Sequence, residues 1–396
     1  MINYILKKDK LLSFILSVFV FILLVDPTNS IFRIKGLIFL ILLFFCTLYS
    51  FKIIKFGLLF VIIIYSIILT TFFIGIIFPY EFDYNYTLSV LKGFSPLILL
   101  LWIDKISLLK KMIFPSLVVS IIVIITFLIF NYAPTLFDIL YYFYMRHDAT
   151  MMIAKRSFIG FDIISFFYKS LPALIIPFTI YTHKFFNIEK KRIINFTIFF
   201  IFLITFFLSG TRSNIIASIL VVFIYIIIWL SRFNYGKLLI IPIFTVFFIT
   251  FSILFFSLLS DKNEESIKIK YSNLYTYYNL AKKHPSIFLF GQGAGSKYYS
   301  YGRHEFVVIN ELTYFEIIRM FGLFGALIII FLLFLPLYLL YKKRKVLTYW
   351  FPVFLGYLFY LLIGGTNPLL IGSTGMLVLL TAYSYTLNPY YKSHIW

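Results

Sequence analysis

The sequence predicts an all-α polytopic membrane protein with about twelve transmembrane helices and two large extracytoplasmic loops. Hydrophobic residues make up 62% of the 396 residues and charged residues only 13%, whereas an ordinary soluble domain is about a quarter charged. Apolar runs close to the roughly 20 residues that a spanning helix needs recur from end to end. Tyrosine (31 residues) gathers near the ends of these runs, where an amphipathic ring suits the membrane interface.

Twelve apolar runs are predicted to span the membrane, which places both ends of the chain on one side. The first run follows KKDK and lacks the small-residue cleavage site of a signal peptide, so we expect an uncleaved span. The fourth run is unusual because it contains Lys92 and Pro96. In chain order the predicted spans are 11–25, 36–50, 56–78, 87–103, 112–130, 163–183, 193–209, 213–230, 238–259, 320–341, 347–363 and 368–386.

The distribution of Lys and Arg predicts the orientation. Nineteen of them lie in the short connections and ends of one side, and four, namely Arg33, Lys35, Lys92 and Arg212, lie opposite. Cytoplasmic loops carry the excess of positive charge, so the first side is expected in the cytoplasm. Much of the formal net charge of +20 follows from this topology.

Two segments on the outer side are too long to be simple connectors. They are residues 131–162 and 260–319, and both are rich in tyrosine. We treat residues 1–396 as a single integral membrane domain with these two extracytoplasmic loops. The one cysteine, Cys46, lies in an apolar run, so no intrachain disulfide can form.

One arginine stands between two uncharged apolar runs in FFLSGTRSNIIAS, residues 206–218. The preceding span of about 16 residues reaches about 24 Å, against a hydrocarbon core of about 30 Å, so the turn is expected below the outer surface. A guanidinium there is costly unless an anion or a polar group meets it, and its planar fork matches phosphate oxygens. Arg212 is therefore a candidate phosphate ligand. The alternative is an interfacial arginine that reaches lipid phosphates, with Ser213 or Asn214 capping the next helix.

The second loop contains FGQGAGSKYYSYGRHEF, residues 290–306. GQGAG lacks the GK[ST] ending and the flanking strand and helix of a nucleotide-binding loop, so we interpret it as a flexible turn. Cations outnumber carboxylates near the end of this loop, which suits an anionic ligand or a solvated basic face.

The loop leads into NELTYFEIIRMFG, residues 310–322. We expect Asn310 to cap a helix and Glu311 to lie in its first turn, either as a carboxylate favoured by the helix N-terminus or as a general base. Glu316 and Arg319 are spaced i, i+3 and are expected to pair.

Two Arg-His-acid triplets, residues 146–148 and 303–305, occur in the two loops. No metal-ligand spacing repeats within either loop, so we interpret them as coincidental and predict no metal and no cofactor. Nucleic-acid binding is not expected, because the basic residues are split between the two sides of the membrane.

Three features together resemble the superfamily of O-antigen polymerases and O-antigen ligases. They are the turn Ser209-Gly210-Thr211-Arg212-Ser213, the large late loop with its glycine-rich piece, and the exit of that loop from Glu311 to Gly325. Ligases of this superfamily carry a His-Asn pair at the entrance to the last helix. Here Glu311 stands at the matching position and His304 is seven residues earlier, which favours the polymerase branch.

The resemblance implies a glycosyltransferase that joins undecaprenyl-pyrophosphate-linked oligosaccharides into O-antigen, part of lipopolysaccharide, or into capsular polysaccharide. Its active site would face outward from a bacterial cytoplasmic membrane. The departing pyrophosphate needs positive charge, and the attacking hydroxyl needs a base. Arg212, Glu311 and His304 are the expected catalytic residues. The expected substrate-binding residues are Arg146, Arg156, Lys297, Arg303 and Arg319.

Two other functions remain open. One is an O-antigen ligase that transfers the polysaccharide to a lipid acceptor, and the other is a non-enzymatic flippase for lipid-linked oligosaccharide. A flippase would be expected to carry charges within its spans and to show two related halves. Besides membrane lipids and the lipid-linked sugars, the expected partners are a chain-length regulator and a separate flippase.

Overall fold

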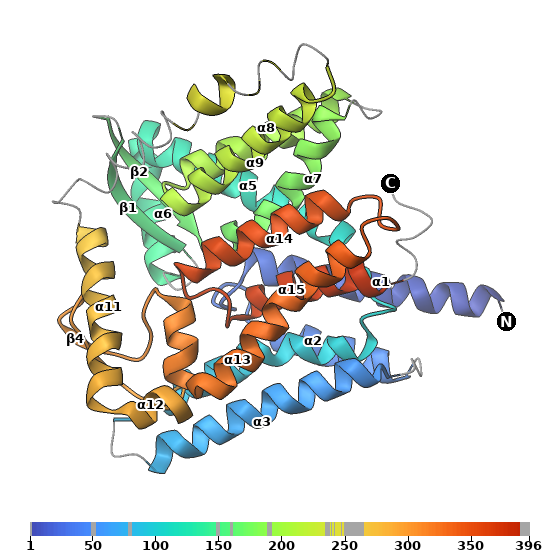
Figure 1. Cartoon of the computed structure of the whole chain (residues 1–396). Helices are drawn as coiled ribbons and strands as arrows, with labels where there is room; N and C mark the ends of the chain where they lie inside the picture. Colours follow the sequence, from blue (N-terminus) through green and yellow to red (C-terminus); the bar gives the residue numbers. More distant parts are fainter. Residues whose placement is uncertain are drawn as a thin grey trace.

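The computed structural model of the chain describes residues 2–48, 53–77, 81–147, 151–158, 161–187, 192–233, several positions between 238 and 248, and 265–388. Within these residues the protein is mostly helical and contains two short β-hairpins (Figure 1). The α-helices of the first half are α1 (Ile2–Val25), α2 (Lys35–Leu48), α3 (Lys55–Ile77), α4 (Tyr84–Phe94), α5 (Leu109–Tyr132), α6 (Pro134–Arg146) and α7 (Ile175–Phe186). Those of the second half are α8 (Arg192–Leu208), α9 (Arg212–Leu230), α11 (Glu265–Lys283), α12 (Pro285–Phe290), α13 (Thr313–Lys342), α14 (Trp350–Gly365) and α15 (Ser373–Leu387).

The remaining elements are two 3-10 helices and four strands. The 3-10 helices are η1 (Ser95–Trp102) and η2 (Leu171–Leu174). The strands form two antiparallel hairpins, β1 (Met151–Phe158) with β2 (Phe161–Tyr168), and β3 (Tyr298–Ser300) with β4 (Glu305–Val307).

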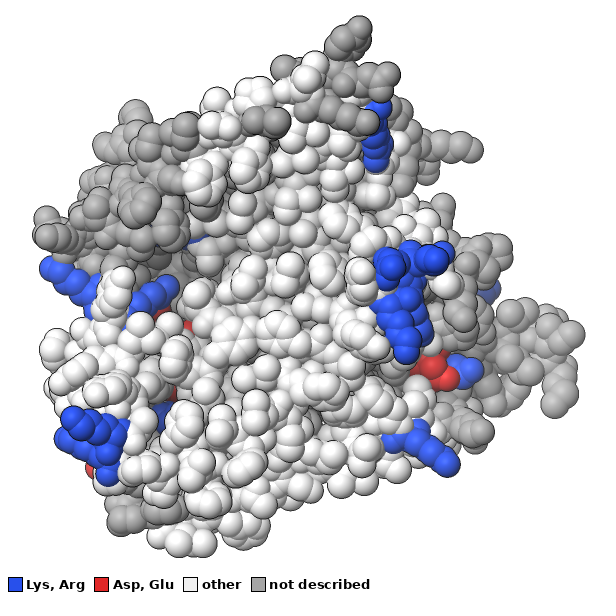
Figure 2. All heavy atoms as spheres, in the orientation of Figure 1, with Lys and Arg blue, Asp and Glu red and all other residues white. Residues whose placement is uncertain are grey.

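Four of the described helices, α3, α5, α9 and α13, are long and apolar enough to cross a membrane. The helices α2, α8 and α14, and the part of α1 from Lys10 to Val25, are apolar but shorter. Large apolar side chains cover the outside of these helices, including Ile77, Phe73 and Phe324. Figure 2 shows charged side chains gathered toward two opposite ends of the visible face, with a broad uncharged band between them. These features indicate a helical multi-pass membrane protein.

The centre of the bundle is formed by α15 and α7. Residues 373–386 of α15 are all buried, as is nearly all of α7. A helix that is surrounded on every side needs no polar face. The hydroxyls of Tyr383 and Tyr357 donate to the carbonyls of Leu332 (2.9 Å) and Leu333 (2.6 Å) on α13. These bonds tie α15 and α14 to α13 from inside.

The expected sixth span, residues 163–183, is only partly helical. Its first residues form β2, η2 follows, and α7 begins at Ile175. The first large loop, residues 131–162, is likewise folded, because it contains α6 and pairs β1 with β2. The prediction of an all-α protein is therefore corrected by the two hairpins.

The other predicted spans agree with the helices of the structure to different degrees. The turn at residue 210 does separate two helices, α8 and α9, close to the expected bounds. The fourth run is short and irregular, since α4 ends at Phe94 and passes into η1 with Pro96 in its first turn. The ninth run, residues 238–259, lies mostly outside the described residues.

Both large segments lie at one end of the bundle, which we call the loop-bearing end. Tyr168, at the end of β2, donates to the carbonyl of Val25 at the end of α1. Ser373, at the start of α15, donates to the neighbouring Pro27 carbonyl (3.4 Å). Thr313, at the start of α13, donates to the carbonyl of Asn367. Figure 1 shows α11, α12 and the β1–β2 hairpin on this end, with the start of α1 opposite.

Helix α13 is broken at Gly322, whose φ of 67° and ψ of 173° are not helical. Essentially only glycine adopts this pair of angles. A Cβ added there would lie 2.4 Å from the Leu289 carbonyl oxygen. The break divides α13 into a short first segment, residues 313–321, and a second segment that continues as a membrane helix. Figure 1 shows the first segment and α11 crossing the end of the bundle, steeply inclined to α3.

Candidate functional site

The first segment of α13 carries a buried ion pair between Glu316 and Arg319. The i, i+3 spacing places both side chains on one face of the helix, and Nη2 of Arg319 lies 2.8 Å from a Glu316 oxygen. The pair that the sequence predicts is therefore confirmed. Arg319 also donates to Gln292, the Ser296 carbonyl and the Val308 carbonyl. A guanidinium has five N–H donors, and these bonds together with two to Glu316 use all five.

Two tyrosine hydroxyls complete the environment of Glu316. Tyr277 of α11 donates to Oε1 at 2.7 Å, and Tyr298 of β3 donates to the same oxygen. The Arg319 guanidinium stacks over the Tyr298 ring at 4.4 Å. Burial and the charge of Glu316 raise the pKa of both tyrosines well above its ordinary value, so both remain donors. This cluster fixes α11 and the β3–β4 hairpin against α13.

The glycine-rich run is a buried backbone junction. Residues 291–296 are all buried, and the N–H groups of Gln292 and Gly293 donate to the carbonyls of Arg319 (2.7 Å) and Met320 (3.2 Å). A Cβ on Gly293 would lie 2.7 Å from the Thr71 carbonyl oxygen of α3. The run is thus held between α3 and the break in α13. The expected turn is present at Ala294 and Gly295, and it is buried, because the glycines allow backbones to meet.

Asn310 and Glu311 also differ from expectation. Helix α13 begins at Thr313 with no side-chain cap, so Asn310 does not cap it and Glu311 precedes its first turn. Instead, Asn310 is buried, and its Oδ1 accepts from Asn273 of α11 (2.7 Å) and from the Glu311 N–H (2.9 Å). Glu311 remains partly exposed, and its carboxylate lies 3.9 Å from the Lys270 ammonium. A carboxylate in this position can accept a proton from a bound hydroxyl.

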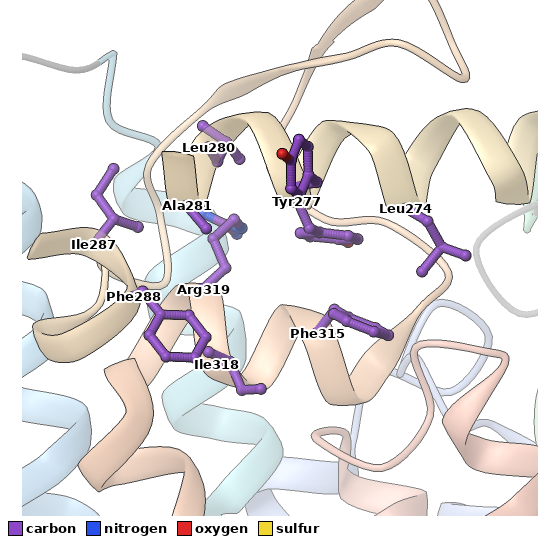
Figure 3. A pocket seen from close by; sticks show the side chains of 10 residues that line it. Leu274, Tyr277, Leu280, Ala281, Ile287, Phe288, Phe315, Ile318 and Arg319 are labelled. Atoms are coloured by element: carbon purple, nitrogen blue, oxygen red, sulfur yellow. The ribbon is translucent and has the colours of Figure 1, made fainter. Parts of the chain in front are cut away.

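A groove of about 270 Å³ runs between α11, α12 and the first segment of α13 (Figure 3). Its lining is apolar and aromatic apart from the Arg319 side chain and the tyrosine hydroxyls. Figure 3 shows Ile287 and Phe288 at one end, and Leu274 and Phe315 at the other. The lining residues are Leu274, Tyr277, Tyr278, Leu280, Ala281, Ile287, Phe288, Phe315, Ile318 and Arg319.

The two ends of the groove have different surroundings. The α12 end carries exposed Phe288, Leu289 and Phe290, and the glycine-rich run after α12 meets α3 at Thr71, six residues before that helix ends. Six helical residues span about 9 Å, so α12 lies level with the last turns of a membrane helix. At the other end, Lys270 lies one helical turn before the lining residue Leu274 on α11. Glu311 precedes α13, four residues before the lining residue Phe315.

Other predicted residues of the second loop lie on the β3–β4 hairpin or beside it. Arg303 and His304 are exposed in its turn, where His304 has a φ of 56° and its N–H donates to the Ser300 carbonyl at 2.8 Å. Lys297 pairs with Glu81 at 2.9 Å. Their hydrogen bond lowers the pKa of Glu81 and raises that of Lys297. This exposed pair joins the hairpin to the segment before α4.

The remaining predicted arginines lie on other elements. Arg146 ends α6 and is exposed. Arg156 is opposite Ile163 in the β1–β2 register, and its side chain lies outside what the structure describes. Arg212 is the first residue of α9 and is half-buried.

The start of α9 belongs to the loop-bearing end. Tyr225, late in α9, stacks edge-on against Phe351, early in α14, so the two helices run in opposite directions. Arg212 therefore lies on the side where α14 ends. There the Tyr314 hydroxyl of α13 donates to the Leu361 carbonyl at 3.0 Å. Arg212 and Glu311 thus share one end of the bundle.

Sequence reasoning missed Tyr277, Tyr298 and Gln292 as partners of the ion pair. Their signal was weak, because the loop contains many tyrosines and only the fold selects two of them. Among the described residues, no group of three or more His, Cys, Asp or Glu side chains is placed to hold a metal ion. No protein-family model, curated protein or solved structure matches this chain.

Proposed function

We propose that this protein is a polymerase that joins lipid-pyrophosphate-linked oligosaccharide units at the membrane face carrying α11, α12 and the hairpins. The observation that carries the proposal is the groove, which extends from an apolar, membrane-level end at α12 toward the side of α11 where the Glu311–Lys270 pair lies. From Ala281 to Lys270 along α11 the separation is about 16 Å. A lipid-linked sugar needs such a path, apolar at one end and charged at the other.

The proposed chemistry uses this polarity. The polyprenyl chain of a donor lies in the groove, and its sugar lies beside Glu311. A hydroxyl of the acceptor sugar attacks the anomeric carbon of the donor while its proton passes to the Glu311 carboxylate. The bond between that carbon and the diphosphate oxygen breaks, and the lipid diphosphate leaves with the electron pair. Positioned cations stabilise such a leaving group.

Arg212 is the proposed diphosphate ligand, with Arg303, Arg146 and Arg156 as further cations and His304 as the alternative base. Arg319 has a different role in this proposal, because its donors are all engaged within the protein. It positions the wall of the groove and does not bind substrate directly. Lys297 similarly positions the hairpin through Glu81.

The groove can be tested by filling it. We expect Ala281→Trp to lower polymer formation at least about tenfold in a strain that lacks the chromosomal gene, since excluding a bound chain at a cost of about 1.4 kcal/mol changes affinity tenfold. Ser286→Trp is the matched control, because Ser286 is exposed on α12 and does not line the groove.

The readout is the glycan pattern of the complemented strain. A ladder reduced to single repeats in the Ala281→Trp strain supports the polymerase. Full-length polymer that never reaches its final acceptor indicates the ligase, and repeats that remain in the cytoplasm indicate the flippase. A normal ladder with well-inserted Ala281→Trp protein rejects the groove as the substrate path.

A further inference from the structure

A second charged cluster lies at the loop-bearing end, around Asp26. Asp26 follows α1 and is fully buried. The backbone at Lys169 is held beside the end of α1, because its neighbours Tyr168 and Ser170 donate to the carbonyls of Val25 and Leu24. Lys35 approaches from the start of α2, and its ammonium donates to the Pro27 carbonyl at 2.6 Å. Three separate parts of the chain thus bring two lysines to one aspartate.

The carboxylate of Asp26 is largely used by the backbone. It accepts from the N–H groups of Ser30 (2.9 Å), Ile31 (3.1 Å) and Phe32 (2.7 Å). These bonds fold the connection between α1 and α2 into a fixed loop. A single negative charge therefore stands near two lysines, Lys35 and Lys169.

The ammonium groups of the two lysines differ in how many hydrogen-bond acceptors the protein provides for them. Lys35 donates to Pro27 and to the Ser373 hydroxyl (3.1 Å), so one of the three N–H donors of an ammonium remains. Lys169 is half-buried, and among the described residues it has no hydrogen-bond or ion-pair partner. Burial lowers the pKa of Lys169, as expected for a charge removed from water without compensation.

We infer that Lys35 and Lys169 form a binding site for a phosphate or diphosphate group. Such an anion balances the surplus positive charge and accepts the N–H donors that the protein leaves unused. Both lysines are partly exposed, so the site is reachable from the loop-bearing end. It is separate from the groove and does not depend on the proposed function.

The test is binding of inorganic pyrophosphate to the full-length protein purified in a neutral detergent, without added divalent cations. We expect pyrophosphate to raise the unfolding temperature of the natural protein, because a ligand that binds only the folded state stabilises it. Lys169→Gln should weaken the apparent affinity at least about tenfold, the change that about 1.4 kcal/mol produces. Lys169→Arg should retain binding, which separates loss of charge from loss of fold.

Lys283→Gln is the matched control, since Lys283 is an exposed lysine in the last turn of α11 and its replacement should leave binding unchanged. Two further arms identify the source of the phosphate. Stabilisation by farnesyl pyrophosphate that requires Lys169 points to a prenyl diphosphate. Stabilisation by phosphatidylglycerol alone, again dependent on Lys169, points to a lipid headgroup. If no ligand distinguishes Lys169→Gln from the natural protein, the inference is wrong.

Discussion

Among single residues, Arg319 and Arg212 show how differently one side-chain type can be used. Arg319 is buried, and its five donors are all taken by acceptors of the protein. Arg212 begins α9 on the same end of the bundle and is only half-buried. From the sequence both were candidates for binding phosphate. The full burial of Arg319 could not be predicted, because it depends on which carbonyls the folded loop brings to this arginine.

Replacing Arg212 with alanine is expected to stop polymer formation while the protein still inserts. The physical reason is loss of a permanent positive charge beside the proposed diphosphate. Arg212→Lys keeps a charge but not the planar fork, so we expect partial activity. The measurement is the glycan ladder together with the amount of protein in the membrane. Normal polymer with Arg212→Ala would remove this residue from the mechanism.

Glu311→Gln separates the proposed base from binding. The amide keeps the shape of the side chain but cannot take the proton, and general-base catalysis contributes about 10²–10⁴-fold to a rate. We therefore expect at least about a 100-fold loss of joining, with lipid-linked repeats still present. Glu305→Gln, on the exposed strand β4, is the matched control. Full-length polymer in the Glu311→Gln strain would assign the base elsewhere.

Glu316→Gln tests the buried ion pair. Removing one partner leaves Arg319 buried without its counter-charge, which costs about 3–5 kcal/mol. We expect a large fall in the unfolding temperature of the purified protein. The unfolding temperature of the double variant Glu316→Met, Arg319→Met should fall less, because this variant removes both charges. A small effect of Glu316→Gln alone would show that the pair does not hold the loop in place.

Among the elements, the helices around the SGTRSN turn were predictable and the β1–β2 hairpin was not. The apolar run 163–183 reads as one span, yet residues 161–168 pair with β1 and only the later part is helical. A short apolar run rich in Ile and Phe fits a strand as well as a buried helix. Lys169 marks the boundary, and it is also the lysine that the Asp26 cluster leaves unsatisfied.

Gly322→Ala is expected to disrupt the break in α13. The new Cβ would lie 2.4 Å from the Leu289 carbonyl oxygen. In addition, essentially only glycine adopts the φ and ψ angles of residue 322. Such backbone strain costs about 1–3 kcal/mol before any clash, so we expect a clear loss of unfolding temperature. Gly36→Ala is the control, because nothing lies within 4 Å of its added Cβ. Equal stability of the two variants would contradict the described backbone contact.

For the whole molecule, the amino-acid composition predicted the class of helical membrane protein well but predicted the number of membrane spans poorly. Long apolar helices and an uncharged band on the surface agree with a helical multi-pass membrane protein. The number of spans was harder to predict from the sequence. Helices α7, α14 and α15 are shorter than a full membrane crossing and are buried by neighbouring helices. Hydrophobicity reports burial in protein and burial in lipid alike, so it cannot tell these helices from lipid-facing ones.

The predicted orientation can be measured with cysteine labelling, since the natural chain has a single, buried cysteine, Cys46. In a Cys46→Ala background, Lys283→Cys on α11 should react with a membrane-impermeant maleimide in intact spheroplasts. Arg344→Cys, between α13 and α14, should react only after the membrane is opened. Both positions are exposed. The reverse pattern would place the loop-bearing end in the cytoplasm.

The backbone junction at residues 291–293 has a mechanical consequence. Its amides hold the last carbonyls of the first α13 segment, while Gly293 lies against α3. Sliding of α3 along its own axis should therefore displace the first segment of α13, which lines the groove and carries the ion pair. Bilayer thickness influences how such a helix tilts. A change in thickness is therefore expected to change the width of the groove at its α12 end.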